Sequence, residues 1–217
     1  MRPCYIDERS KRPMNTTKTV IIDNGGGRIK YGLATDESPR SAPNCIAQVR
    51  KTMTSYTADQ LDADLNGSLL HYTRPHDHGY LTKMETQRQI WARLFDNIMH
   101  VTPNESTLIM TEPMFNFDSI QNDINEVIFE EYGFAYHMRR PACWFSAYEY
   151  ASNPPADAVH ADCCTVIDSG FSFTHIVPFI NLKCQKHAVN IIQHSYLYAF
   201  LAQSINAYTY TYMLYVV

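Results

Sequence analysis

The chain has 217 residues, of which 45% are hydrophobic, and this is enough apolar material for the core of a folded domain. Its formal net charge of -4 argues against a surface that binds nucleic acid directly, because such surfaces are usually basic. The six cysteines show no C-x-x-C spacing and the N-terminus has no apolar signal stretch. We therefore expect reduced thiols in a cytosolic or nuclear compartment.

The N-terminal part of the chain predicts an extension followed by a hairpin. Residues 1–16 mix charge, proline and small polar groups without periodicity, and we expect them to be flexible. Residues 19–23 and 29–34 are β-branched and apolar, and predict two strands. Asn24-Gly25 between them favours a tight turn with two residues at positive φ. Residues 45–49 are expected to form a third strand.

The middle of the chain alternates between an insertion, helices and strands. Residues 50–80 are polar and predict an irregular insertion. Thr82 and Glu85 fit a capping box, which predicts a helix start, and Asp118 is expected to cap a second helix. Apolar residues at helical spacing predict the two buried faces: Ile90, Trp91, Leu94, Phe95, Ile98 and Met99 in the first helix, and Ile120, Ile124, Val127, Ile128 and Phe129 in the second.

Short strands separate these helices. We expect strands at 107–110 and 134–138, a third helix at 142–150, and a break at Pro154-Pro155. Three strands followed by helix, strand, helix, strand and helix predict an α/β fold with a mixed sheet flanked by helices. Ligands on such sheets bind at the ends of the strands, which is where Asp23 lies.

The stretch CTVIDSGFSFTHIVPF, residues 164–179, repeats the pattern of VIIDNGGGRIKYGL, residues 20–33. In each, a β-branched strand ends in an aspartate, a glycine turn follows, and a second apolar strand begins. Either stretch alone is more often an ordinary hairpin than a ligand site. The pair indicates two turns that bind the phosphates of a nucleoside triphosphate from opposite sides, because glycine lets backbone N–H groups approach phosphates closely.

Charged residues beside these turns suggest further roles. Asp23 and Asp168 would repel phosphate, so we expect them beside the water shell of a Mg²⁺ ion, which takes few protein carboxylates. Lys30 would add a positive charge toward the phosphates, and His175 would orient a water. The alternatives stay open: Lys30 is solvated on an edge strand, and His175 is a core histidine that donates to a carbonyl.

Other candidate sites give weaker signals. The run His76-Asp77-His78 has no further ligand at metal-binding spacing, so we interpret it as a loop. Cys163-Cys164 beside His160 is a similarly weak metal signal. Trp91 and Trp144 are interpreted as core residues.

At these residues the sequence resembles the actin family, in the two turns DNGGGRIKYGL and DSGFSFTHIVP and in the segments RPHDHGYL, LIMTEPMFNF and NEVIFEEYGF. The resemblance covers about residues 18–190 and implies an actin-like ATPase fold of the ribonuclease H-like type. It also implies ATP and Mg²⁺ as ligands. By resemblance, the phosphate-binding residues would be Asp23, Asn24, Gly25, Gly26, Gly27 and Lys30 in the first loop, and Asp168, Ser169, Gly170 and His175 in the second, with Asp23 and Asp168 toward the metal.

Three departures from actin argue against efficient ATP hydrolysis. Gly26 stands where actin has a serine that touches the terminal phosphate, and Phe171 stands where it has an aspartate. Ala142 occupies the place of a water-positioning glutamine. Since placement of water and electrostatic preorganisation supply most of the rate of phosphoryl transfer, we expect ATPase activity to be slow or absent.

The resemblance also implies a domain plan. We expect a first actin-like domain at 17–155 with the insertion 50–80, and the opening hairpin of a truncated second domain at 156–190. Residues 191–217 form a divergent, tyrosine-rich tail with no charged Asp, Glu, Lys or Arg. It is too polar for a membrane span, and we expect a buried strand or an aggregation-prone end. The missing remainder of the pocket predicts weak ATP binding.

The segments quoted above further resemble nuclear actin-related proteins of a remodeller that places a variant histone into nucleosomes. The leading hypothesis is therefore a structural, non-enzymatic subunit of a chromatin-remodelling complex, located in the nucleus and in part the cytoplasm, which contacts histones and nucleosomes only indirectly. An active ATPase or phosphotransferase of the actin, sugar-kinase and chaperone superfamily is the alternative. A filament-forming actin is a third possibility.

Overall fold

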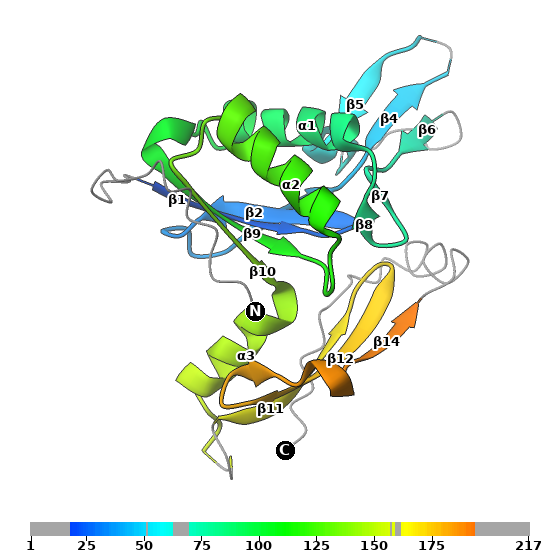
Figure 1. Ribbon diagram of the computed structural model, residues 1–217. Coiled ribbons are helices and arrows are strands. Elements are labelled where there is room, and N and C mark those ends of the chain that lie inside the picture. The colour runs from blue at the N-terminus through cyan, green and yellow to red at the C-terminus, as the bar shows by residue number, and fades with distance from the viewer. Residues whose placement is uncertain (1–17, 51, 63–69, 157, 159–161, 194–217) are drawn as a thin grey trace. The chain divides into compact units, whose positions relative to one another are not determined.

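The computed structural model describes residues 18–50, 52–62, 70–156, 158 and 162–193 (Figure 1). These residues divide into two compact units, one up to Arg139 and one from Arg140 onward. The predicted extension 1–16 and residues 194–217 of the predicted tail lie outside the described residues. The domain boundary at 155–156 stays a prediction. Within the described ranges, no helix combines the length and apolar character needed to cross a membrane.

The first unit is built on a five-stranded mixed sheet in the order β10-β9-β1-β2-β3. β1 and β2 form the predicted antiparallel hairpin, and β9 runs parallel to β1 with Leu108 opposite Val20. A parallel neighbour requires a long crossover connection, and the segment containing α1 supplies it. The strands are β1 (Lys18–Asn24), β2 (Arg28–Leu33), β3 (Arg40–Pro43), β9 (Ser106–Glu112) and β10 (Tyr136–Pro141).

Two helices cover one face of this sheet, as Figure 1 shows. α1 (Met84–Ala92) continues into the π-helical segment η3 (Arg93–Ile98), and α2 (Asp118–Glu126) continues into η5 (Val127–Glu131). A short 3-10 turn, η4 (Pro103–Glu105), precedes β9. The predicted helical faces are confirmed as core or as residues packed against it, except Phe129, which is half-buried and lies outside this cluster. They join the inward residues of the sheet: Val20, Ile22, Ile29, Tyr31, Leu108 and Met110.

Both helix starts differ from the prediction. Lys83, not Thr82, precedes α1, and it makes no side-chain cap. Thr82 does not cap the helix either, because its hydroxyl and its backbone N–H both donate to the carbonyl of Pro75. Phe117 precedes α2, again without a side-chain cap. Asp118 is therefore the first helical residue, where its carboxylate interacts favourably with the positive end of the helix dipole.

Residues 50–80 are more regular than predicted. β4 (Ile46–Val49) does not join the main sheet; it pairs with β5 (Ser55–Thr57) and β6 (Leu70–Thr73) in a separate three-stranded sheet. The third strand of the main sheet is β3 instead. The short helix η1 (Ala58–Asp62) and the hairpin of β7 (His76–Asp77) and β8 (Tyr80–Leu81) complete the region. The His76-Asp77-His78 run thus lies in a hairpin and not in an irregular loop.

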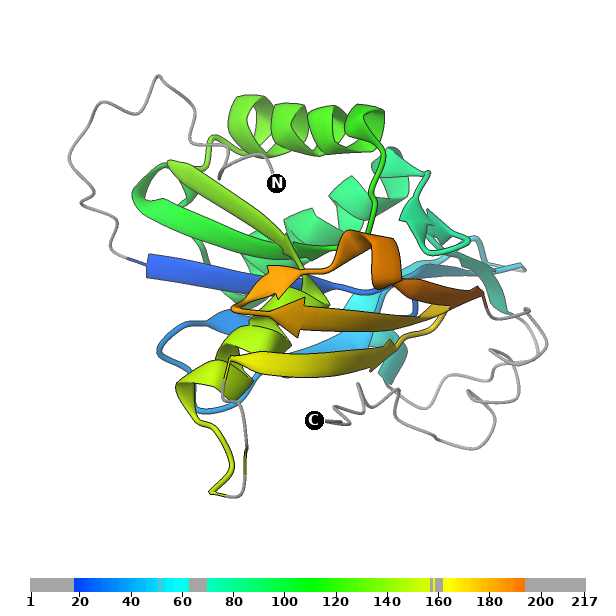
Figure 2. The ribbon, with the colours of Figure 1, turned by 60° about the horizontal axis from the view of Figure 1, so that its bottom comes forward.

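The second unit contains the second predicted hairpin, and Figure 2 shows its strands side by side. β11 pairs with β12, and β12 pairs on its other side with β13 and β14. α3 belongs to this unit. Its elements are α3 (Ala142–Ser152), β11 (Cys163–Ser169), β12 (Phe173–Ile180), β13 (Lys183–Cys184), η6 (Lys186–Ala188) and β14 (Asn190–Gln193).

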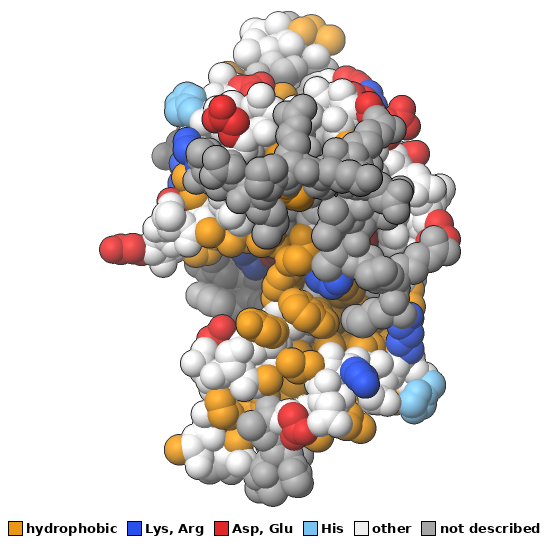
Figure 3. All heavy atoms as spheres, turned by 60° about the vertical axis from the view of Figure 1, so that its left-hand side comes forward, with side chains coloured by type: hydrophobic (Ala, Val, Ile, Leu, Met, Phe, Trp, Pro, Cys, Tyr) orange, Lys and Arg blue, Asp and Glu red, His pale blue; other side chains and the backbone are white. Residues whose placement is uncertain are grey.

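The cysteines and one tryptophan test two further predictions. The five described cysteines form no disulfide, as expected, while Cys4 lies outside the described residues. Trp144 is half-buried and not core: its ring stacks on Tyr148 with centroids 5.6 Å apart, and Arg140 lies over it. Apolar side chains reach the surface in several places (Figure 3). Among the described residues of the second unit, the exposed large ones are Tyr148, Ile180, Ile191 and Ile192.

A buried histidine in the first unit predicts a pH dependence of stability. Burial, with a smaller contribution from Arg139, lowers the pKa of His137 from 6.5 to about 3. A lowered pKa means that the unfolded chain binds the proton first, so stability is lost as pH falls from about 6.5 toward 3. At pH 4.5 this loss is about 2–3 kcal/mol. In urea unfolding between pH 7 and 4.5, His137→Phe should lose less stability than the unsubstituted chain by about this amount, and equal losses would contradict the assignment.

Candidate functional site

The two glycine turns share one architecture. In the first unit Asp23 pairs across the hairpin with Lys30, and Asn24 pairs with Ile29. In the second unit Asp168 pairs with His175, and Ser169 pairs with Thr174. Each turn therefore spans four residues, with a glycine first and an aspartate two residues before it. The repeat seen in the sequence is also a repeat of strand register.

Close approach of the backbone, not a positive φ, requires glycine at the first position of the first turn, whereas the second turn leaves room for a Cβ at Gly170. A Cβ on Gly25 would lie 2.6 Å from the carbonyl oxygen of Arg28, and one on Gly170 would lie 3.4 Å from that of Phe173. Asn24 remains in β1, so the expected two-residue turn at Asn24-Gly25 is wrong. A two-residue turn with both φ positive occurs instead at His78-Gly79, with φ of 47° and 80°.

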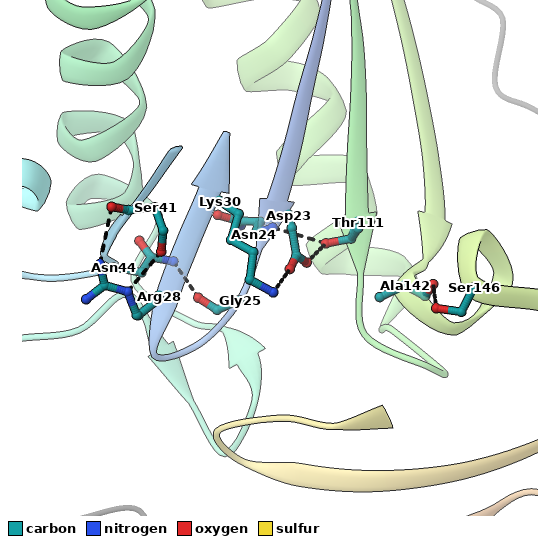
Figure 4. A network of polar contacts seen from close by, with 10 residues as sticks. All are labelled: Asp23, Asn24, Gly25, Arg28, Lys30, Ser41, Asn44, Thr111, Ala142 and Ser146. Carbon is teal, nitrogen blue, oxygen red and sulfur yellow. Dashed lines mark hydrogen bonds and ion pairs between the residues drawn. The ribbon is translucent and has the colours of Figure 1, made fainter. Parts of the chain in front are cut away.

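A network of hydrogen bonds holds Asp23 at the end of β1 (Figure 4). The hydroxyl of Thr111 on β9 donates to Asp23 Oδ1 at 2.6 Å and accepts from the backbone N–H of Asn24 at 3.0 Å. Lys30 Nζ lies 3.2 Å from Asp23 Oδ2. Because β2 lies between β1 and β3, Lys30 is not on an edge strand, contrary to the alternative interpretation. Its contact with phosphate stays a prediction.

Two carbonyl groups of the first turn, those of Gly25 and Gly27, are bonded toward the protein. Asn44 Nδ2 donates to the carbonyl oxygen of Gly25 at 2.8 Å, and the backbone N–H of Asn44 donates to that of Gly27 at 3.0 Å. Arg74 Nη1 also donates to the carbonyl oxygen of Gly27, at 3.2 Å. The side chain of Asn44 is in turn bonded to Gln87 on α1. Four side chains that the sequence did not single out therefore surround this turn: Asn44, Arg74, Gln87 and Thr111.

The second turn is built differently in detail. The backbone N–H of Gly170 donates to the carbonyl of Phe173 at 2.8 Å, and the hydroxyls of Ser169 and Thr174 share a hydrogen bond at 3.0 Å. His175 is 8% exposed and its ring lies 5.4 Å from that of Phe173. Burial lowers the pKa of His175, which favours a neutral imidazole. A neutral ring can orient a water or donate to a carbonyl, so both interpretations of His175 stay predictions.

The first turn fits a hydrated metal and a phosphate chain. Each Asp23 oxygen uses one lone pair within the protein and retains another. Asn24 Oδ1 is buried and has no hydrogen-bond partner among the described residues. Over the same residues, no cluster of three or more His, Cys, Asp or Glu side chains could ligate a metal directly. The spare lone pairs of the Asp23 carboxylate suit Mg²⁺, which takes few protein carboxylates and keeps several of its waters.

The predicted site residues thus form two groups, one in each unit. Asp23, Asn24, Gly25, Gly26, Gly27 and Lys30 lie together in the first, and Asp168, Ser169, Gly170 and His175 lie together in the second. The sharing of one Mg²⁺ ion between Asp23 and Asp168 stays a prediction. The four residues missed around the first turn carry no local signal, because they come from the β3–β4 connection, the segment after β6, α1 and the end of β9.

Comparison with known proteins gives consistent matches. A family model described as Actin matches residues 14–193. A rice protein, Actin-related protein 6 of Oryza sativa subsp. indica, is 38% identical over 174 residues, which are 78% of this chain and 40% of the relative. Actin-like protein ARP6 of Cryptococcus neoformans is 37% identical over 171 residues, 76% of this chain and 34% of the relative.

An animal relative has a similar match. Actin-related protein 6 of Drosophila melanogaster is 34% identical over 165 residues, which are 74% of this chain and 41% of the relative. The chain therefore spans about two fifths of the length of the curated relatives it matches.

The Thr111 hydroxyl predicts a measurable effect on the first turn. Thr111→Val keeps the shape of the side chain but leaves Asp23 and the N–H of Asn24 without their shared partner. We expect a loss of about 1–3 kcal/mol in the free energy of unfolding, because both groups are partly buried. Thr19→Val on β1, where no side-chain hydrogen bond is described, is the matched control and should change stability by less than about 0.5 kcal/mol. Equal effects in urea unfolding would contradict the network.

Proposed function

Since this chain belongs to the actin family, we propose that it is an actin-related structural subunit that binds ATP through its glycine turns and hydrolyses it slowly or not at all. The family match confirms the actin-like fold class, a mixed sheet flanked by helices. The observation that carries the proposed role is the 34–38% identity to relatives from a plant, a fungus and an insect that are named Actin-related protein 6 or Actin-like protein ARP6. An actin-family role of that type is supported directly by these matches.

The nuclear setting is the finer part of the proposal. The resemblance of the segments LIMTEPMFNF and NEVIFEEYGF supports a subunit of a chromatin-remodelling complex of the Swr type, which exchanges a variant histone into nucleosomes. In this proposal the partners are other subunits of that complex. Histones and DNA are contacted through them, consistent with a net charge of -4, and the chain is located in the nucleus.

ATP is proposed as a ligand that stabilises the fold, not as fuel. The first turn offers a lysine, a carboxylate with spare lone pairs and closely packed backbone, which suit a phosphate chain with Mg²⁺. Hydrolysis needs a positioned water and preorganised groups at the terminal phosphate. At the three positions where the resemblance implies such groups, this chain has Gly26, Phe171 and Ala142, and none of these side chains can hold a water by a hydrogen bond.

Nucleotide binding is tested by thermal unfolding with Mg²⁺ and ATP. A ligand at 100 times its Kd stabilises the folded chain by about 2.7 kcal/mol, so we expect a higher Tm at millimolar ATP. Lys30→Ala should reduce that rise, whereas Lys18→Ala, the same change at the far end of the adjacent strand β1, should preserve it. Phosphate release should stay near the background rate. Turnover like that of an active ATPase would favour the alternative function, and no rise in Tm would contradict nucleotide binding.

The subunit role is tested separately by co-purification. The tagged full chain, recovered from nuclear extract, should be enriched in subunits of a chromatin remodeller relative to the tag alone, as measured by quantitative mass spectrometry. Enrichment of filament-associated proteins without remodeller subunits would contradict the role.

A further inference from the structure

A pair of amides lies buried beneath the first glycine turn. Asn44 and Gln87 are both 0% exposed, and their side chains bond each other in both directions, each at 3.3 Å. Gln87 lies on the inward side of α1 with Ile90 and Trp91. A glutamine among apolar side chains costs stability unless its amide is bonded, and Asn44 is the partner that bonds it.

Asn44 uses all of its side-chain hydrogen-bonding groups in fixed directions. The two N–H groups of its amide can serve the carbonyl of Gly25 and the Oε1 of Gln87, while its Oδ1 accepts from Gln87 Nε2. The Gln87 contact therefore fixes the orientation of the Asn44 amide. With that orientation fixed, the Nδ2 group points at the glycine turn.

The orientation of two peptide groups follows from these bonds. In a trans peptide the C=O and the next N–H point in opposite directions. Asn44 draws the carbonyl of Gly25 inward, so the N–H of Gly26 points away from the protein side. The bond to the Gly27 carbonyl orients the peptide between Gly27 and Arg28 in the same way. Among the described residues, no hydrogen bond uses the N–H of Gly26. The carbonyls of Gly25 and Gly27 are thus held away from an anion at the turn, and the N–H of Gly26 is presented to it.

We propose that Asn44, locked by Gln87, is the positioning residue that makes the turn between β1 and β2 able to bind a polyphosphate. The inference rests on the proposed nucleotide binding and adds to it a residue that does not touch the ligand. Gln87 connects this arrangement to α1, because its amide bonds Asn44 and Asn44 in turn bonds the carbonyl of Gly25.

The variant Asn44→Asp tests this in the full chain without any ligand. It keeps the shape of the side chain but removes both donors and places a negative charge beside the Gly25 carbonyl. We expect the backbone order parameters of residues 25–28 to fall from about 0.85 to below about 0.6. Residual dipolar couplings should show a changed N–H orientation at Gly26, a result that a general loss of stability does not produce in a folded chain. Asn104→Asp makes the same change at an exposed site before β9 and should alter neither quantity.

A second measurement uses inorganic tripolyphosphate with Mg²⁺ as the probe, titrated by calorimetry. We expect Asn44→Asp to weaken binding at least tenfold and Asn104→Asp to leave it within twofold. Gln87→Met keeps Asn44 but removes the hydrogen bonds that orient its amide, and it should weaken binding three- to tenfold. If Asn44→Asp does not fold, Gln87→Met serves as the test.

The outcomes separate the two proposals. Absence of probe binding to the unsubstituted chain overturns the proposed nucleotide binding, while the N–H orientation at Gly26 still decides the role of Asn44. An unchanged orientation and unchanged order in both the Asn44 and Gln87 variants overturn the positioning role, whatever the chain binds. Equal weakening by Asn104→Asp would also overturn it, because the effect would then come from charge alone.

Discussion

The parallel pairing of β1 with β9 is the constraint on which the first site depends. Parallel strands end at the same edge of a sheet, and the register that sets Ile22 opposite Met110 puts Thr111 beside Asp23. The hydroxyl of Thr111 then bonds both the carboxylate and the next backbone N–H. An antiparallel β9 would bring its other end to this edge. The direction of one strand, set by the crossover through α1, therefore decides what surrounds the aspartate.

The polar groups at this edge differ in what they contribute to stability. The side chains of Asp23 and Lys30 are 34% and 40% exposed, and ion pairs with that exposure contribute little to stability. The Asn44–Gln87 pair is fully buried, and there each amide is needed to satisfy the other. The buried pair thus shapes the turn, while the exposed pair is available to a ligand. This division of roles is consistent with membership of the actin family, because resemblance to that family implies a nucleotide site at this turn.

The two turns show that one backbone plan can carry different chemistry. Both place an aspartate two residues before a glycine, and both pair the aspartate across the hairpin. The partner is a charged lysine in the first turn and a buried histidine in the second, where burial lowers the pKa and favours the neutral ring. The repeat in the sequence reflects the shared backbone, and the differences between the copies distinguish their sites.

The sequence by itself determined the hairpins, the apolar faces of the helices and the aspartate–glycine pairs, because periodicity and turn residues are local signals. It did not determine which strand follows β2 in the sheet, since β3 and residues 46–49 are equally short and only tertiary pairing separates them. It also placed the start of α1 wrongly. The local pattern predicts that the Thr82 hydroxyl caps the helix, but in the structure this hydroxyl donates to the carbonyl of Pro75. Asn44 and Gln87 are 43 residues apart and become partners only when α1 packs on the sheet. Their role was decided by the tertiary structure, because burial makes each amide depend on the other.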